Sequence, residues 1–272
     1  MGDSHPMLGL NPDSIPGAIN LAGTSEYYFL SYLKLRKALE SGLNKPEIII
    51  LPLDLHSFAA HGNMLLKQHE LDDPFWSSQI DMQEIISSGL PADFTRWWIS
   101  ARFFPYAGQY YRLFARMFKN EAYALSAKGF AVVHTSFGDL GSAERKKAAE
   151  ERYRAHFDKY NCFDTLQIQS LKNISNLCFK HKIRLMLVSF PLSGEYLHRA
   201  ASGACTDSIR SLHRKIAGNA AHFDYSHLFQ NNAGFFSDPN HLNAAGAAIF
   251  SALLRRDLEN LRKKPVGAPE EI

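Results

Sequence analysis

The stretch EIIILPLDLHSF, residues 47–58, decides the fold class of this chain. Its first half is a continuous apolar run, which is typical of a strand buried on both faces of a parallel sheet. Ahead of it, residues 15–42 predict a short strand ending at Leu21 and then a helix, with Thr24 or Ser25 as its cap. The apolar residues of that helix recur at three- and four-residue steps: Tyr28, Tyr32, Leu35 and Leu39. Strand, helix and strand in succession predict an α/β fold with a parallel sheet.

The same alternation returns in the second half of the chain. The pattern predicts an amphipathic helix, a buried strand, a second helix, a final short strand and a closing helix, over residues 163–182, 183–193, 205–219, 221–229 and 241–264. Small residues near the start of the closing helix would let it pack closely on the sheet. The sequence therefore predicts that strands from both halves of the chain form one sheet, with an inserted segment between them.

The interruption, residues 60–157, is predicted to be a helical insertion with an unusual content of aromatic residues. Fifteen of the 33 aromatic residues of the chain lie between Phe75 and Phe137. Aromatic side chains at this density indicate either a small core of the insertion's own or a lid or lipid-facing surface beside a site. The charged stretch 143–160 within it is typical of a solvated helix face.

Composition excludes several classes of function. The chain has 272 residues, a net charge of +3 and a hydrophobic fraction of 46%. It shows no basic face, so we expect no nucleic-acid partner. The three cysteines, Cys162, Cys178 and Cys205, have no paired spacing, and we expect neither a zinc site nor a disulfide framework. No apolar run is long enough for a membrane helix, so the chain as given is expected to be soluble.

Residues that carry chemistry stand near the two ends of the chain. The sequence begins MGDSHPMLGLNP, and residues 235–246 read FFSDPNHLNAAG. The three-residue step from Asp238 to His241 allows the carboxylate to fold back onto the imidazole, which can then accept a proton from a serine hydroxyl such as Ser4. In a parallel sheet the loops that carry these residues meet at the carboxyl ends of the strands. The alternative is structural: Asp238 would cap the closing helix and His241 would lie in its first turn.

Gly2-Asp3-Ser4 near the start, with Asp238-x-x-His241 near the end, resembles the SGNH/GDSL hydrolase superfamily. The wider sequence over residues 2–58 and 163–255 is similar to that of bacterial SGNH-like proteins of polysaccharide O-acylation systems, of the DltD and alginate-acetylation type. The resemblance implies a single flavodoxin-like α/β/α domain over residues 1–272, with residues 60–157 inserted. It implies Ser4 as nucleophile, His241 as base and Asp238 as its orienting carboxylate. We expect no cofactor and no metal.

The oxyanion donors implied by the resemblance are the amide of Ser4 and that of Gly23. The family's third donor, an asparagine, is replaced by Leu53, so another donor such as Ser25, Asn20 or Asn63 has to be considered. Three further polar residues are candidates for lining the substrate site: His5, Asp54 and His56.

The strand that precedes Gly-Asp-Ser in the family is not part of this sequence. We therefore expect that the natural protein begins further upstream, with that strand and a signal or membrane anchor, and that it lies in the periplasm or cell envelope. Three functions remain open. The first is a serine esterase or O-acyltransferase acting on an acylated polysaccharide or small ester, with a membrane acylation complex as a candidate partner. The others are a non-catalytic envelope protein that binds glycan or acylation partners, and a lipase-like hydrolase of membrane lipids.

Overall fold

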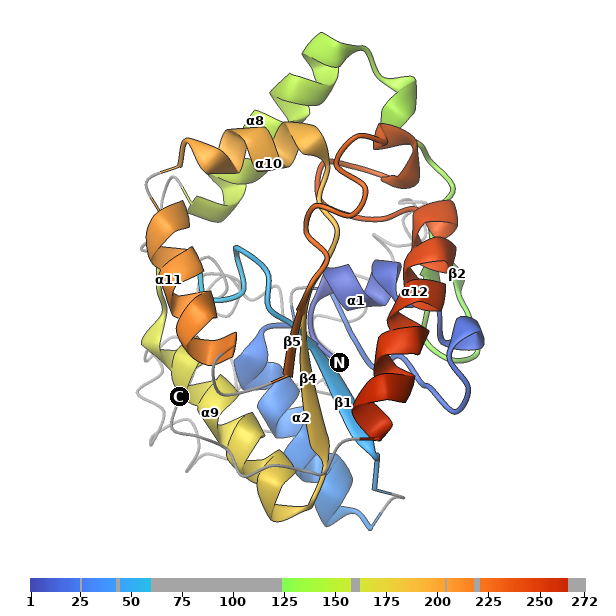
Figure 1. The fold of residues 1–272 in the computed structure, drawn as a ribbon, viewed down its shortest axis with the longest axis vertical. Helices are drawn as coiled ribbons and strands as arrows, with labels where there is room; N and C mark the ends of the chain where they lie inside the picture. Colours follow the sequence, from blue (N-terminus) through green and yellow to red (C-terminus); the bar gives the residue numbers. More distant parts are fainter. Residues whose placement is uncertain are drawn as a thin grey trace, which may run out of the picture.

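The protein is described by a computed structural model for residues 1–24, 26–42, 45–59, 124–157, 162–203, 205–217 and 221–263. Within these ranges, seven α-helices surround a parallel sheet of three strands (Figure 1). The sheet order is β1-β4-β5, and the strands span Ile48–Pro52, Arg184–Ser189 and Ala221–Asp224. Both outer strands pair in parallel with β4. The α/β class and the parallel sheet are confirmed.

The helices lie in layers on the two faces of this sheet. One face carries α2 (Tyr28–Glu40), α9 (Thr165–Lys180) and α11 (Thr206–Ala217), and the other carries α1 (Ser4–Gly9) and α12 (Ala244–Arg262). Two further helices, α8 (Ser142–Phe157) and α10 (Gly194–Ala201), pack on each other, and α10 follows the carboxyl end of β4 (Figure 1). The described residues also contain three short 3-10 turns, at Pro12–Ser14, Phe137–Asp139 and Ala233–Phe235.

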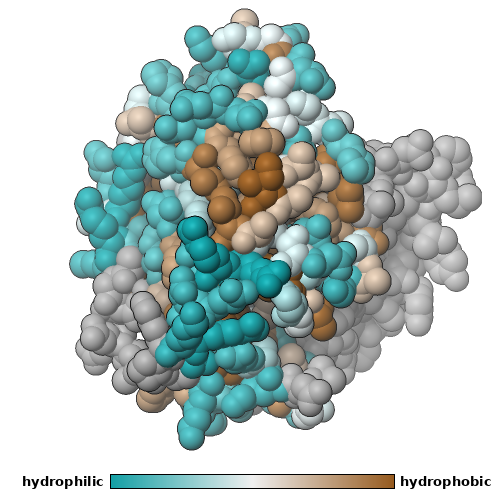
Figure 2. All heavy atoms as spheres, turned by 45° about the vertical axis from the view of Figure 1, so that its right-hand side comes forward, coloured by the Kyte–Doolittle hydropathy of each residue, from teal (hydrophilic) through white to brown (hydrophobic). Residues whose placement is uncertain are grey.

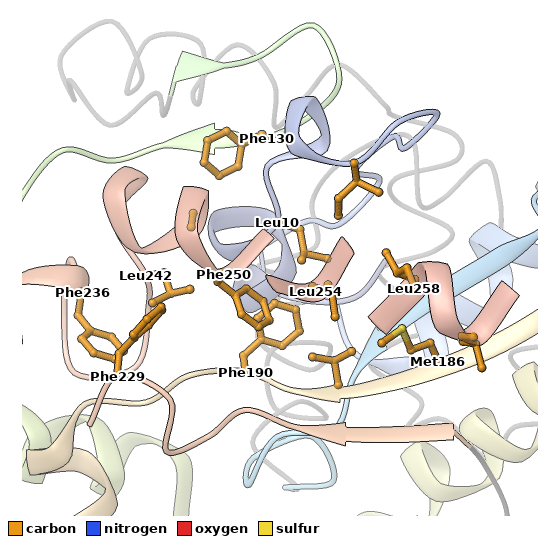
Figure 3. Close-up of a cluster of buried hydrophobic side chains, with 14 of the residues drawn as sticks. Leu10, Phe130, Met186, Phe190, Phe229, Phe236, Leu242, Phe250, Leu254 and Leu258 are labelled. Carbon is orange, nitrogen blue, oxygen red and sulfur yellow. The ribbon is translucent and has the colours of Figure 1, made fainter. Parts of the chain in front are cut away.

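Alternation along β4 places a hydrophobic core on each side of the sheet. Met186 and Val188 face α12, while Leu187 faces α2 and α9. On the α12 side, Phe190 and Phe250 pack with ring centroids 5.3 Å apart (Figure 3). The second core is built by apolar side chains of β1, α2 and α9, among them Leu35, Leu51, Leu171 and Ile174. Burial on both faces explains why these strands read as continuous apolar runs.

The start of α12 needs a glycine, as the run of small residues suggested. A Cβ atom at Gly246 would lie 2.2 Å from the carbonyl oxygen of Phe235. No side chain fits there, so this residue lets α12 approach the preceding loop closely.

The predicted strand ending at Leu21 is wrong. The backbone of this stretch pairs with no strand of the sheet, and Ile19 and Leu21 are 69% and 48% exposed. Asn20 is turned inward instead, and its amide donates to the carbonyl oxygens of Pro6 and Leu10. The cap of the next helix also differs from the prediction. Tyr27 is the residue that precedes α2, and it makes no side-chain hydrogen bond to the helix. Thr24 is therefore not the cap, and Ser25 lies outside the described residues.

The cysteines are not all free, which corrects the expectation from their spacing. Cys162 and Cys205 form a disulfide, with their Cα atoms 5.4 Å apart. Cys178 is a buried free thiol, and burial raises its pKa to about 12. The pairing links the segment before α9 to the segment before α11.

Most of the predicted insertion, residues 60–123, lies outside the described residues. Its last part is not helical throughout, because β2 (Ala124–Leu125) and β3 (Ala131–Val132) form an antiparallel hairpin before α8. Helix α8 also departs from a purely solvated helix, since Tyr153 and Phe157 are buried against α10. In the described part of the chain, no helix combines the length and apolarity needed to cross a membrane.

One face of the molecule gathers apolar side chains. Figure 2, which brings the side with α12 and β2 forward, shows them at its centre with hydrophilic side chains above and below. Exposed large apolar residues of these elements and of the loop beside them include Ile249, Leu125, Ile19 and Leu21. A gathering of this kind is commoner on surfaces that another segment or molecule covers than on freely solvated ones.

Candidate active site

Ser4 is placed by the close contact of the first residues with the end of β1. Gly2 has φ of +115°, and a Cβ atom there would lie 2.4 Å from Pro52, so only glycine fits. Asp3 caps α1 by accepting a hydrogen bond of 2.9 Å from the amide of His5. Ser4 is therefore the first residue of a helix that begins beside the carboxyl end of β1.

His241 and Asp238 lie on a loop that is fastened at both ends. A bridge between Phe236 and Leu242 closes the loop, and the amide of Ser237 donates to the carbonyl oxygen of His241. Asn243, not Asp238, caps α12, by accepting from the amide of Gly246. The structural alternative for Asp238 as a helix cap is therefore wrong.

The structure brings the three residues of the predicted triad together. Ser4 Oγ lies 2.8 Å from His241 Nε2, and His241 Nδ1 lies 2.7 Å from Asp238 Oδ2. The other carboxylate oxygen, Oδ1, accepts from the backbone amides of Asn240 and His241, each at 3.0 Å. This carboxylate holds the ring in one orientation, with the Nε2 atom directed at the serine hydroxyl.

Asp238 is held as a carboxylate by its surroundings. Burial alone would raise its pKa, but the contact with His241 and the Arg152 guanidinium outweigh it and hold the pKa of Asp238 well below its usual range. Arg152 extends from α8, and its Nη2 donates to Asp238 Oδ2 at 3.1 Å. A carboxylate that stays ionised can stabilise a positively charged imidazolium beside it.

A second aspartate and histidine lie directly behind the triad. His5 Nδ1 is 2.9 Å from Asp54 Oδ2, without the alignment of a hydrogen bond. His5 Nε2 is 2.8 Å from the amide nitrogen of Asn240. Burial raises the pKa of Asp54 well above its usual value and lowers that of His5. The rings of His5 and His241 meet edge to face, with centroids 5.0 Å apart.

A third such contact holds the cap of α1. His56 Nε2 lies 3.0 Å from Asp3 Oδ2, and its ring stacks on that of His156 at a centroid distance of 4.5 Å. His156 Nδ1 in turn lies 2.8 Å from the hydroxyl of Tyr196. Burial would raise the pKa of Asp3, but the hydrogen bond from His56 and the nearby His5 hold it well below its usual range.

The three residues expected to line the substrate site are instead buried. Exposed fractions are 2% for His5, 2% for Asp54 and 6% for His56. They contact the residues around Ser4 and His241 from the protein interior, and a role in lining the substrate site stays a prediction.

Sequence reasoning missed four residues of this site: Asp3, Arg152, His156 and Asn240. Asp3 and Asn240 stand inside the quoted motifs and were the easier ones to find. Arg152 and His156 belong to the charged stretch predicted as a solvated face, and only the packing of α8 brings them to the triad.

The oxyanion donors fit the expectation less well. The amide of Gly23 donates to the carbonyl oxygen of Gly2 at 2.9 Å, and the Asn20 side chain is bound to two carbonyls, so neither is free for an oxyanion in this arrangement. Leu53 is fully buried in the core. Ser25 and Asn63 lie outside the described residues. The amide of Ser4 remains, in the first turn of α1, where helix geometry supplies no acceptor.

Comparison with known proteins identifies no relative. No protein-family model matches the chain, and a search of curated proteins finds no significant match. The resemblance to SGNH hydrolases therefore depends on the quoted motifs, and the site depends on its own geometry. Over the described residues, no three His, Cys, Asp or Glu side chains are grouped so as to hold a metal ion.

Proposed function

We propose that this protein transfers acyl groups through an ester on Ser4, as a serine esterase or O-acyltransferase with the SGNH-type flavodoxin-like fold. The observation that carries this proposal is the continuous line from Asp238 through His241 to Ser4, with contacts of 2.7 and 2.8 Å. A serine hydroxyl is a weak nucleophile at neutral pH and becomes effective when a base stands within hydrogen-bond reach.

The reaction follows from this geometry. Asp238 keeps the proton of neutral His241 on Nδ1, so Nε2 can take the proton of the Ser4 hydroxyl as its oxygen attacks the ester carbonyl. The resulting imidazolium then gives that proton to the departing alcohol, and the acyl group stays on Ser4. Water or a sugar hydroxyl accepts the acyl group in a second, mirror-image step. The amide of Ser4 is one donor for the oxyanion.

The substrate class is proposed from the resemblance. SGNH-like proteins of acylation systems act on O-acyl groups of cell-surface polysaccharides, and we extend this substrate, and a periplasmic or envelope location, to the present chain. Helices α8 and α10 lie close to the triad, since Arg152 of α8 contacts Asp238. They are therefore placed to contact the acceptor. The lipase-like alternative depends on residues 60–123, outside the described residues.

One observation favours the non-catalytic alternative. With Gly23 and Asn20 committed to backbone carbonyls, the described residues leave the Ser4 amide as the only candidate donor among those considered. An oxyanion site with a donor missing loses about 10²–10³ in rate in known enzymes. A chain of this kind would bind glycan without turning it over.

Labelling with a fluorophosphonate probe tests the proposal. We expect labelling of the wild type at Ser4, none of Ser4→Ala or His241→Ala, and full labelling of Ser202→Ala, a control serine at the carboxyl-terminal cap of α10. Labelling together with release of acetate from an O-acetylated polysaccharide supports the proposed substrate. Release of fatty acid from phospholipid vesicles favours the lipase-like function instead. No labelling of a folded wild type overturns the proposal in favour of the non-catalytic one.

A further inference from the structure

Two side-chain links join the start of α1 to the loop that carries the base. The first is Ser4 to His241, at 2.8 Å. The second is His5 to Asn240, also at 2.8 Å and between the neighbouring residue on each side. The two links therefore run side by side between segments that are more than 230 residues apart in the sequence.

The second link repeats the arrangement of the triad without its nucleophile. In the triad, a carboxylate faces Nδ1 of the ring and a hydroxyl faces Nε2. In the second link, the Asp54 carboxylate faces Nδ1 of His5, and the amide nitrogen of Asn240 faces Nε2. An amide nitrogen can only donate, so Nε2 of His5 must be the unprotonated nitrogen and Nδ1 carries the proton toward Asp54.

Asn240 depends on this contact. Its side chain is buried, at 2% exposed, and its amide oxygen has no hydrogen-bond partner among the described residues. The nitrogen therefore provides the only side-chain hydrogen bond that the structure gives this residue. Removing the acceptor on His5 would leave a buried amide without any partner, next to the catalytic base.

We infer that Asp54 and His5 form a positioning pair for the triad: Asp54 and the amide of Asn240 together set the tautomer of His5, and His5 holds Asn240 and so the loop of Asp238 and His241 against Ser4. The inference rests on the proposed function, and deepens it by giving a role to the segment in which Leu53 replaces the family's oxyanion asparagine. That segment supplies Asp54, whose Oδ1 is itself fixed at 2.7 Å by the amide of Phe190.

Kinetics test the positioning role. With p-nitrophenyl acetate as substrate, we expect His5→Gln, Asp54→Asn and Asn240→Ala each to lower kcat by about 10- to 100-fold, with KM within about twofold, since a small misplacement of the base costs rate and not binding. His5→Gln combined with Asn240→Ala should cost little more than either change alone, because both break one contact. The matched control is His222→Gln, a half-buried histidine bound to Ser189 on the neighbouring strand, which should keep wild-type kcat.

Unchanged kcat in a folded His5→Gln protein, or losses that multiply in the double variant, would overturn the inference. An equal loss of kcat in His222→Gln would also overturn it, because the effect would then not be specific to His5.

Nitrogen NMR of the histidine rings tests the same contact without catalysis. In the wild type, we expect His5 to be neutral with its proton on Nδ1, and this preference to disappear in Asp54→Asn. A His5 ring protonated on Nε2 overturns the inference even in a fully active protein. If the wild type neither hydrolyses the ester nor reacts with fluorophosphonate, the proposed function fails, while the tautomer of His5 still decides whether the pair exists. The wild-type part of this measurement needs no variant other than those that assign the signal.

Discussion

Two Asp–His pairs stand edge to face in this protein, and they differ in exposure and in the group that meets the far nitrogen. In Asp238–His241 the side chains are 31% and 10% exposed, and the far nitrogen meets a hydroxyl. In Asp54–His5 they are 1% and 0% exposed, and the far nitrogen meets an amide. Only a hydroxyl can give up a proton and become a nucleophile. The same pair of residue types is thus suited to proton transfer at one place and to positioning at the other.

The two pairs also differ in the pKa of their carboxyl group. The pKa of Asp238 is held low by His241 and Arg152, whereas burial raises that of Asp54. Under the proposed function, the site carries an imidazolium during turnover and needs an ionised carboxylate beside it. In the described part of the chain, Arg152 is paired with Asp238, and no arginine or lysine is paired with Asp54.

The largest expected effect comes from exchanging one carboxylate oxygen for nitrogen in each pair. Asp238→Asn should lower kcat by about 10⁴-fold, because the amide would donate to Nδ1 and leave the proton of His241 on Nε2, facing Ser4. Asp54→Asn should cost at least tenfold less. Steady-state kinetics of the two variants measure the difference. Equal losses of kcat would contradict the assignment of proton transfer to one pair and positioning to the other.

The next prediction tests whether the contribution of the buried pair to kcat depends on the stability of the whole fold. Changing both Cys162 and Cys205 to serine should lower the free energy of unfolding by about 4 kcal/mol, since the disulfide closes a loop over a separation of 43 residues. Cys205 packs in the cluster formed by α8 and α10, whose His156 stacks on His56. Urea unfolding checks the loss, and kcat should stay within about twofold. A fall in kcat as large as that of Asp54→Asn would show that the buried pair depends on this layer.

His213 is another buried histidine and gives the baseline for a ring that the structure shows in no hydrogen bond with a carboxylate. Burial, helped by His222, lowers the pKa of His213 to about 4 from an ordinary value of 6.5. Because the folded pKa is the lower one, the folded state binds fewer protons, and stability present above about pH 6.5 is lost as the pH falls toward 4. The loss from this residue is about 3 kcal/mol. Urea unfolding between pH 4 and 7 should show a flatter profile for His213→Leu, and an unchanged slope would contradict it.

The smallest effect concerns Arg152, whose guanidinium contacts Asp238 of the more exposed pair. Arg152→Gln should lower kcat by about three- to fivefold, the size expected for a partly exposed ion pair. It should also raise the pKa of Asp238, so that activity is lost at a higher pH on acidification. Arg145→Gln, on the same helix as Arg152, breaks the pair with Glu195 of α10 and is the control for loss of charge. Equal pH profiles for the two variants would show that Arg152 leaves Asp238 unaffected.

Much of this architecture could be predicted from the sequence. The parallel strands appear as apolar runs because both faces of the sheet are covered. Helices α9, α11 and α12 agree with their predicted ranges to within a few residues, whereas α10 was not predicted. Ser4, Asp238 and His241 stand out because Gly-Asp-Ser and Asp-x-x-His have fixed spacings and follow the order of the strands. Short-range patterns of this kind survive in a single sequence.

What could not be predicted depends on contacts between distant segments. Ile19 and Leu21 look like strand residues, yet Asn20 between them finds its partners in α1, and no local signal reports this. Cys162 and Cys205 have no motif spacing, and their pairing follows from how the segments before α9 and α11 meet. His5, Asp54 and His56 are polar residues near a predicted site, and the sequence shows their proximity to it but not whether they face solvent or the interior.

The cap of α1 ties the chemistry of the site to the local opening of one short helix. Asp3 accepts both from the amide of His5 and from the ring of His56, so a single carboxylate holds the first turn and the nucleophile that the turn carries. A six-residue helix has little stability of its own and lasts only as long as its tertiary contacts do. Under the proposed function, we therefore expect thermal inactivation to begin with the fraying of this turn, and the working lifetime of the protein to follow the rate of that opening more than the unfolding of its core.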